Sequence, residues 1–223
     1  MNYTFLKRNW IFALLLIPIF SAILALYTND FIFKAGVAGG GILILFIMYF
    51  NKFKQSGDVW MILGAFLFSI AGDWFLSNRH GNTGMFIAGI ALFFFAHVGY
   101  LTFALMNGRM HWGFTGLILA IFLLIFSLLF YPNIGDKMLL VAVLIYLLIS
   151  CFSLGAAIGI QASPIVKWFY LFGIALVLFS DTLIAFREFA GYKQLNWLIL
   201  PTYYLAQISV TLALIVRNRL SAK

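Results

Sequence analysis

Long apolar runs alternate with short polar breaks along the whole chain. Eight of the runs are long enough to cross the hydrocarbon core of a bilayer, which takes about 20 helical residues. Their apolar positions are continuous and do not alternate as they would in the strands of a membrane barrel. The pattern predicts an all-α, polytopic membrane protein, with 1–223 as a single transmembrane domain. The expected helices are 9–27, 31–50, 58–77, 84–106, 112–131, 138–160, 165–186 and 195–216.

Composition excludes several classes of soluble protein. Hydrophobic residues make up 65% of the chain and charged residues only 9%, whereas soluble domains carry about 25% charged residues. A globule of this composition would expose more apolar surface than water tolerates, which excludes a soluble enzyme and a disordered regulator. The single cysteine, Cys151, has no partner for an internal disulfide and is too little for a thiolate zinc site.

Charge gives the orientation in the membrane. The net charge of +8 comes from basic residues that stand singly or in pairs between apolar runs, which is typical of loops next to lipid and not of a nucleic-acid-binding patch. If the N-terminus is inside, nine Lys and Arg residues fall on the cytoplasmic side and five on the other. This predicts a multi-pass cell-membrane protein with both termini in the cytoplasm. The first run lacks a signal-peptide cleavage site, so we interpret it as a retained helix.

Two pairs of similar segments indicate an internal duplication. LFSIAGDWFL at 67–76 resembles LVLFSDTLIA at 176–185, and FFFAH at 93–97 resembles YYLAQ at 203–207. The acids in the first pair are 108 residues apart, which is a shift of four helices. Because such a shift preserves helix direction, it predicts two four-helix halves related by a parallel repeat.

Two of the six acidic residues lie inside predicted helices. Asp73 and Asp181 are flanked by apolar residues at similar depth, toward the same membrane face. An ionisable group within a span costs about 2.5–3.5 kcal/mol and usually faces a bundle interior or a wet cavity. The other four acids fall in loops or at helix ends, where solvation or capping explains them: Asp30, Asp58, Asp136 and Glu188.

Asp73 and Asp181 have two interpretations. Each is a buried acceptor of an interhelical hydrogen bond, or the two share one polar pocket. In a shared pocket, burial and a second carboxylate would keep one acid protonated and the other ionised, as general acid catalysis with an anionic partner requires. Arg79 and Arg187 each follow an Asp by six residues, which is more than one turn, so they are available to attract an anionic head group.

Other polar residues lie in two helices. His97 and Tyr100 are three residues apart and share a helix face, although a lone histidine in an apolar helix is often structural. Tyr203, Tyr204 and Gln207 form a second group, for which ordinary interhelical bonding is the alternative. The scattered histidines and the single cysteine do not predict a metal site. No serine-hydrolase, P-loop or dinucleotide motif is present.

The chain resembles the YhhN family, whose better-known members are lysoplasmalogenases. The resemblance rests on GDWFL at 72–76, SDTLIA at 180–185, FAHVGY at 95–100 and YYLAQ at 203–207, together with the length and the eight spans. It covers essentially the whole chain. Gly72 stands where the family pattern has a serine, which is a small-for-small exchange that leaves the following acid in place.

The resemblance implies a membrane hydrolase that needs no cofactor. It would cleave the vinyl ether bond of an alkenyl lysophospholipid, with an ethanolamine or choline head group, into a fatty aldehyde and the glycerophospho-head group. Asp73 and Asp181 would be the catalytic acid and its partner. Substrate or water would be held by His97, Tyr100, Tyr203, Tyr204, Gln207, Arg79 and Arg187.

The same residues leave other functions open. A proton-coupled transporter of lipids or small molecules would use the same pair of Asp residues. A metal-dependent lipid amidase or esterase, or a structural membrane protein, is a further alternative. The sequence predicts neither the oligomeric state nor the side from which a substrate enters.

Overall fold

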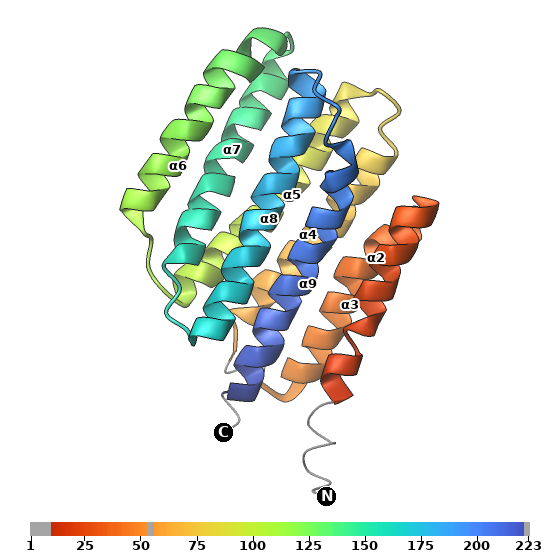
Figure 1. Ribbon diagram of the computed structural model, residues 1–223, viewed down its shortest axis with the longest axis vertical. Coiled ribbons are helices and arrows are strands. Elements are labelled where there is room, and N and C mark those ends of the chain that lie inside the picture. Colours follow the sequence, from red (N-terminus) through yellow and green to blue (C-terminus); the bar gives the residue numbers. More distant parts are fainter. Residues whose placement is uncertain (1–9, 53–55, 221–223) are drawn as a thin grey trace, which may run out of the picture.

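Eight helices in the described part of the chain, residues 10–52 and 56–220 of this computed structural model, are long and apolar enough to cross a membrane. No strand occurs among these residues, which confirms the predicted all-α membrane fold. Figure 1 shows the helices packed side by side, with successive helices running in opposite directions. The helices are α2 (Leu16–Thr28), α3 (Phe31–Tyr49), α4 (Val59–Ser77), α5 (Thr83–Met106), α6 (Trp112–Ile125), α7 (Lys137–Ile158), α8 (Pro164–Phe189) and α9 (Asn196–Leu220).

Two of the spans extend beyond the regular α-helices. The first span begins one helical turn before α2 and covers Trp10–Thr28. The fifth span, Trp112–Asn133, continues α6 through a π-helix (Phe126–Phe130) and a short 3-10 turn (Tyr131–Asn133). A π-helix widens the helix locally, and such segments often lie near functional sites. Here the π-helix also packs against α8.

Short polar segments end the helices. The side chain of Asp136 accepts a hydrogen bond of 2.9 Å from the backbone N–H of Leu139, so Asp136 caps α7 as predicted. Helix α8 begins at Pro164, a residue suited to the first helical turn, and it ends at Phe189. The sequence pattern had placed the end of this helix at 186. The three additional residues bring a basic side chain, Arg187, into the last turn, where it interacts favourably with the helix dipole.

The helix contacts follow the pairing that a repeat of two four-helix halves requires. The most extensive contacts join α4 to α5 and α8 to α9, which are equivalent pairs under a shift of four helices. The contact between α5 and α7 likewise corresponds to the contact between α9 and α3. The second helix of each half therefore packs on the last helix of the other half.

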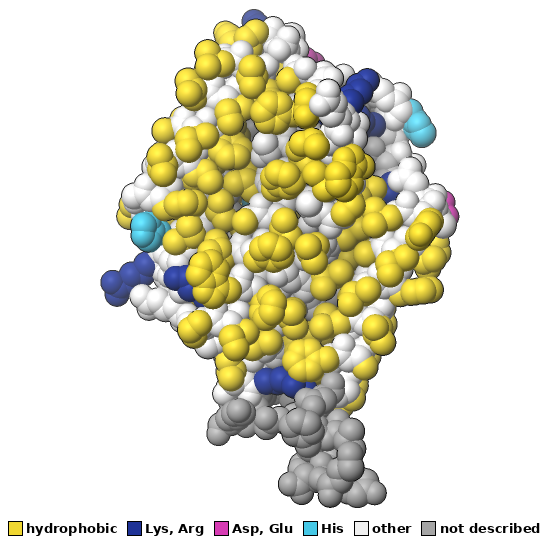
Figure 2. All heavy atoms as spheres, viewed as in Figure 1, with side chains coloured by type: hydrophobic (Ala, Val, Ile, Leu, Met, Phe, Trp, Pro, Cys, Tyr) yellow, Lys and Arg dark blue, Asp and Glu magenta, His cyan; other side chains and the backbone are white. Residues whose placement is uncertain are grey.

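The surface of the bundle is suited to lipid. Large apolar side chains are exposed around its middle, and Figure 2 shows them over most of the visible face, with the Lys and Arg side chains mainly toward the two ends. The buried core is also apolar and is built mainly from α3, α4, α5, α7, α8 and α9. Because water is absent from the hydrocarbon region, the backbone groups of such spans must be paired within the helices.

Asp58, at one end of the bundle, connects three helices and does not cap one with its side chain. It precedes α4 but makes no side-chain cap bond; instead its carboxylate is bound by the guanidinium of Arg217 on α9 and by the amide of Asn107, at 2.7 Å. Its side chain is only 8% exposed. The expectation that solvation or capping explains Asp58 is therefore wrong. The carboxylate ties the start of α4 to the ends of α5 and α9.

Candidate functional site

A cavity of about 380 Å³ opens at the other end of the bundle, where α3 and α9 begin and α4 and α8 end. Both intramembrane acids, Asp73 of α4 and Asp181 of α8, line it. The two acids therefore share one hollow, which is the condition that acid–base chemistry with two carboxyl groups requires. The other lining residues are Asn29, Lys34, Leu76, Ser77, Arg79, Phe93, Ser180, Ile184, Arg187, Asn196, Ile199, Leu200 and Tyr203.

Asp73 is held by a tyrosine of another helix. The hydroxyl of Tyr203 on α9 donates a hydrogen bond of 3.2 Å to Oδ2 of Asp73. The ring of Tyr203 packs edge-on against Phe93 of α5, which also lines the cavity. A Cβ at Gly72 would lie 2.8 Å from that Phe93 ring. The glycine thus lets α4 approach the aromatic wall next to Asp73, and a serine here would require a shift of the ring.

Asp181 is held by two residues at the same oxygen. The hydroxyl of Tyr146 on α7 donates to Oδ2 of Asp181 at 2.5 Å, and Nε2 of His97 on α5 lies 3.3 Å from that atom. The His97 ring is fully buried and packs edge-on against the rings of Tyr146 and Tyr100. The Asp181 side chain keeps 12% of its surface exposed. Asp181 is therefore fixed on one side and accessible on the other.

Tyr146 was not expected to be part of the site. It lies in the most uniformly apolar stretch of α7, and its only sequence signal is a hydroxyl one turn before Ser150, whose own hydroxyl donates to the Tyr146 carbonyl. A single tyrosine in an apolar run is usually a packing or interface residue. Only the packing of α7 against α8 shows that it contacts an acid.

Each carboxylate has one oxygen anchored and one oxygen free. Among the described residues, Oδ1 of Asp73 and Oδ1 of Asp181 have no hydrogen-bond partner, while each Oδ2 is bound. Anchoring one oxygen restricts the orientation of a carboxyl group that lines the cavity. Such a geometry suits a carboxyl group that exchanges a proton with a bound molecule.

The two arginines that follow the acids lie at the cavity wall. Both are bound by Glu188: Arg79 makes two hydrogen bonds to it, of 2.7 and 3.0 Å, and Arg187 makes one of 2.8 Å through Nε. Arg79 also lies over the ring of Phe86, at 4.8 Å from its centroid. The sequence predicts that Glu188 is a solvated residue at a helix end. In the structure it binds both arginines and holds them together at the rim of the cavity.

Four of the expected binding residues are buried and do not line the cavity. His97, Tyr100, Tyr204 and Gln207 are each exposed by no more than 2%. The Tyr100 hydroxyl is in hydrogen-bonding contact with Ser69, which also contacts the Tyr203 hydroxyl. The Tyr204 hydroxyl and the Gln207 amide have no hydrogen-bond partner among the described residues. These polar groups extend the site inward from Asp73, along α9.

Two apolar slots adjoin Asp181 from the side of α7. One, of about 60 Å³, lies between α5, α7 and α8 and is lined by Phe86, Ile90 and Val143 among others. The second, of about 50 Å³, lies between α6, α7 and α8 and includes residues of the π-helix. Tyr146 and Asp181 line both slots, and Asp181 lines the large cavity as well. Asp181 thus stands where a polar cavity meets apolar ones.

Comparison with known proteins gives one match. The model of the YhhN family matches residues 31–214, which include both acids and all residues that line the cavity except Asn29. A search of curated proteins found no significant match, and neither did a search of solved structures.

Proposed function

Because the chain belongs to the YhhN family, we propose that it is a membrane-embedded hydrolase that cleaves the vinyl ether bond of lysoplasmalogens. The products would be a fatty aldehyde and a glycerophosphoethanolamine or glycerophosphocholine. The observation that carries the proposal is the placement of Asp73 and Asp181 in one cavity, each with a free carboxyl oxygen.

Hydrolysis of a vinyl ether would use two carboxyl groups, one as an acid and one as an anion. Such a bond resists bases and nucleophiles, but protonation of the carbon distant from the oxygen gives an oxocarbenium ion. Water adds to this cation, and the resulting hemiacetal collapses to the aldehyde and the free glycerol hydroxyl. One acid of the pair would give the proton to carbon; the other, as the anion, would stabilise the cation and take a proton from the attacking water. One carboxyl group loses a proton and the other gains one, so the total charge of the pair is the same after the reaction as before it.

The neighbouring side chains would position these reactants. Tyr203 orients Asp73, while Tyr146 and His97 orient Asp181. The buried hydroxyl of Tyr204 and amide of Gln207 would provide unpaired polar groups for a water molecule behind the cavity. Similar logic with two carboxyl groups operates in glycoside hydrolysis, which is an analogy of chemistry and not of fold.

The cavities suggest how the substrate would lie. The head group and glycerol would lie in the large cavity, and the alkenyl chain would run along the apolar slots beside Tyr146. The scissile bond joins these two parts of the lipid, so it would lie next to Asp181, where the cavities meet. With both termini in the cytoplasm, as the basic residues suggest, the polar cavity would open on the opposite side of the cell membrane.

Aldehyde release from a purified lysoplasmalogen in detergent tests the proposal. Asp73→Asn and Asp181→Asn keep the side-chain shape but remove the proton donor or the anion, so each should lower the rate by about 10²–10⁴-fold. Asp136→Asn is the matched control, because Asp136 caps α7 at the same end of the bundle outside the cavity. Wild-type rates in both cavity variants would refute the assigned roles.

The same assay separates the alternatives. A proton-coupled transporter that uses the two acids would release no aldehyde, and its transport into proteoliposomes would depend on both acids instead. Loss of aldehyde release on treatment with a chelator, with recovery on adding a divalent metal, would indicate a metal-dependent enzyme. A purely structural role would make both Asn variants less stable without any activity to lose.

A further inference from the structure

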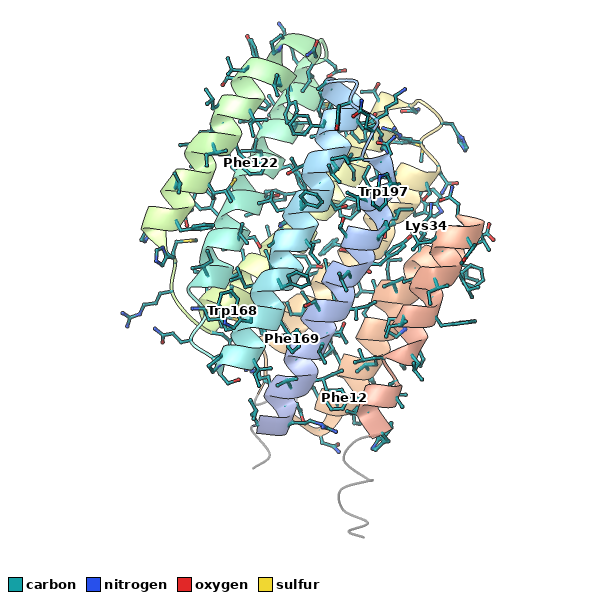
Figure 3. The ribbon with its side chains drawn as sticks, in the orientation of Figure 1. Phe12, Lys34, Phe122, Trp168, Phe169 and Trp197 are labelled. Carbon is teal, nitrogen blue, oxygen red and sulfur yellow. The ribbon has the colours of Figure 1, made fainter. Side chains whose placement is uncertain are left out.

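Of the three cationic side chains that line the cavity, Lys34 forms the fewest hydrogen bonds and ion pairs with described residues. It lies in the first turn of α3, near the open end of the bundle, where Figure 3 labels it. Its Nζ donates a long hydrogen bond, 3.4 Å, to the hydroxyl of Ser77, and it forms no ion pair with any described residue. Both Lys34 and Ser77 line the cavity. Lys34 also interacts electrostatically with Asp73, but its one hydrogen bond is weak, so it loses little when it turns to a ligand.

The two arginines that line the cavity, Arg79 and Arg187, are already paired with a carboxylate. Glu188 neutralises one of their two charges and contacts four of their nitrogens, both terminal nitrogens of Arg79 and Nε and one terminal nitrogen of Arg187. An anion that approached the arginines would have to compete with this carboxylate. The expectation from sequence, that Arg79 or Arg187 meets a phosphate, is thus less favoured by the geometry than a contact with Lys34.

We propose that Lys34 anchors the phosphate of the lipid head group, with neutral help from Ser77 and from the nearby amides of Asn29 and Asn196. All four residues line the same cavity as the acids. Lysine is a common phosphate ligand because its compact charge accepts several geometries. This inference rests on the proposed function for the identity of the lipid, but the binding of a phosphate does not depend on catalysis.

The position of Lys34 also fixes the direction of the substrate. It approaches the cavity from α3, while the apolar slots open between α5, α6, α7 and α8. A lipid whose phosphate lies at Lys34 and whose chain lies at Tyr146 would extend through the cavity that both acids line, with its ether bond on the side of Asp181.

Binding of non-cleavable analogues tests Lys34 apart from any reaction. We would measure the affinity of the purified protein in detergent for a saturated 1-alkyl lysophospholipid and for the matching 1-alkylglycerol, which lacks the phosphate. Lys34→Gln should lower the affinity for the phospholipid by about 10- to 100-fold and leave the affinity for the alkylglycerol unchanged. Lys34→Arg should restore part of the affinity, and Lys137→Gln, an exposed lysine at the same end, should change neither.

The outcomes separate this inference from the proposed function. Equal affinities of the wild-type protein for the two analogues, or equal losses for both in Lys34→Gln, would overturn the role of Lys34. Absence of aldehyde release by a wild-type protein that binds the phospholipid through Lys34 would overturn the hydrolase alone. Melting curves of the variants, with Lys34→Arg as the folded reference, would show whether a loss of binding reflects unfolding.

Discussion

The hydrogen bond from Tyr146 to Asp181 gives a sharp test of the site. Tyr146→Phe removes only a hydroxyl, and the ring can keep its edge-on contact with His97. The bond is short, at 2.5 Å, and its acceptor is a carboxyl group. If Asp181 is to act on the substrate, its free oxygen must be aimed at the cavity, and Tyr146 is one of two groups that aim it.

The size of the effect follows from the geometry. A hydrogen bond to a charged group contributes about 1.5–3 kcal/mol, which corresponds to about 10- to 150-fold. His97 continues to hold the same oxygen at 3.3 Å, so the loss should lie near the lower end. We therefore expect kcat to fall about 10- to 30-fold, with little change in KM, because Tyr146 positions the acid and is not needed to bind the head group.

The assay is aldehyde release at saturating and limiting lysoplasmalogen, with Tyr49→Phe as the control. Tyr49 also buries its hydroxyl, which donates to the Leu214 carbonyl at 3.0 Å at the far end of the bundle. Its loss should cost about 1 kcal/mol of stability and leave kcat unchanged. A Tyr146→Phe enzyme with wild-type kcat would show that Tyr146 does not position Asp181 for the reaction, and equal losses of kcat in both variants would indicate a global effect.

Two further predictions concern stability and the chain slots. Asp58→Ala leaves Arg217 without its carboxylate, so the free energy of unfolding should fall by about 2–4 kcal/mol, less than for a fully buried pair because Arg217 is 26% exposed; thermal unfolding in detergent measures this, and an unchanged melting temperature would contradict it. Val143→Trp fills the slots that Val143 lines, so kcat/KM should fall at least about 10-fold for long alkenyl chains and much less for short ones. Val141→Trp, on a 52% exposed neighbour, is its control, and the same loss for all chain lengths would argue against the slots.

The positions of the two acids were accessible from the sequence because charge is costly inside a membrane. Asp73 and Asp181 are conspicuous in apolar runs, and the shift of four helices from one to the other places both at one end of the bundle. The helical spans were likewise evident from uninterrupted hydrophobicity. These features depend on local sequence and on solvent, so no tertiary contact is needed to recognise them.

The partners of the acids were not accessible in the same way. Whether Tyr146 contacts Asp181, or whether Glu188 binds both arginines, depends on the rotation of each helix about its axis. The helices are apolar on all sides, so lipid-facing and core-facing sides cannot be told apart by hydrophobicity. The pair of Asp58 and Arg217 was missed for the same reason, since 159 residues separate its members.

Each acid contacts a helix of the other half of the chain, and this gives the two aspartates different neighbours. Asp73 of the first half is held by α9 of the second, and Asp181 of the second half is held by α5 of the first. In a dimer of identical four-helix units the two acids would be interchangeable. The shift of 110 residues that aligns FFFAH with YYLAQ places Phe93 opposite Tyr203 and His97 opposite Gln207. A phenol alone holds Asp73, whereas a phenol and an imidazole hold Asp181, so the two carboxyl groups have unequal surroundings that two identical units could not provide.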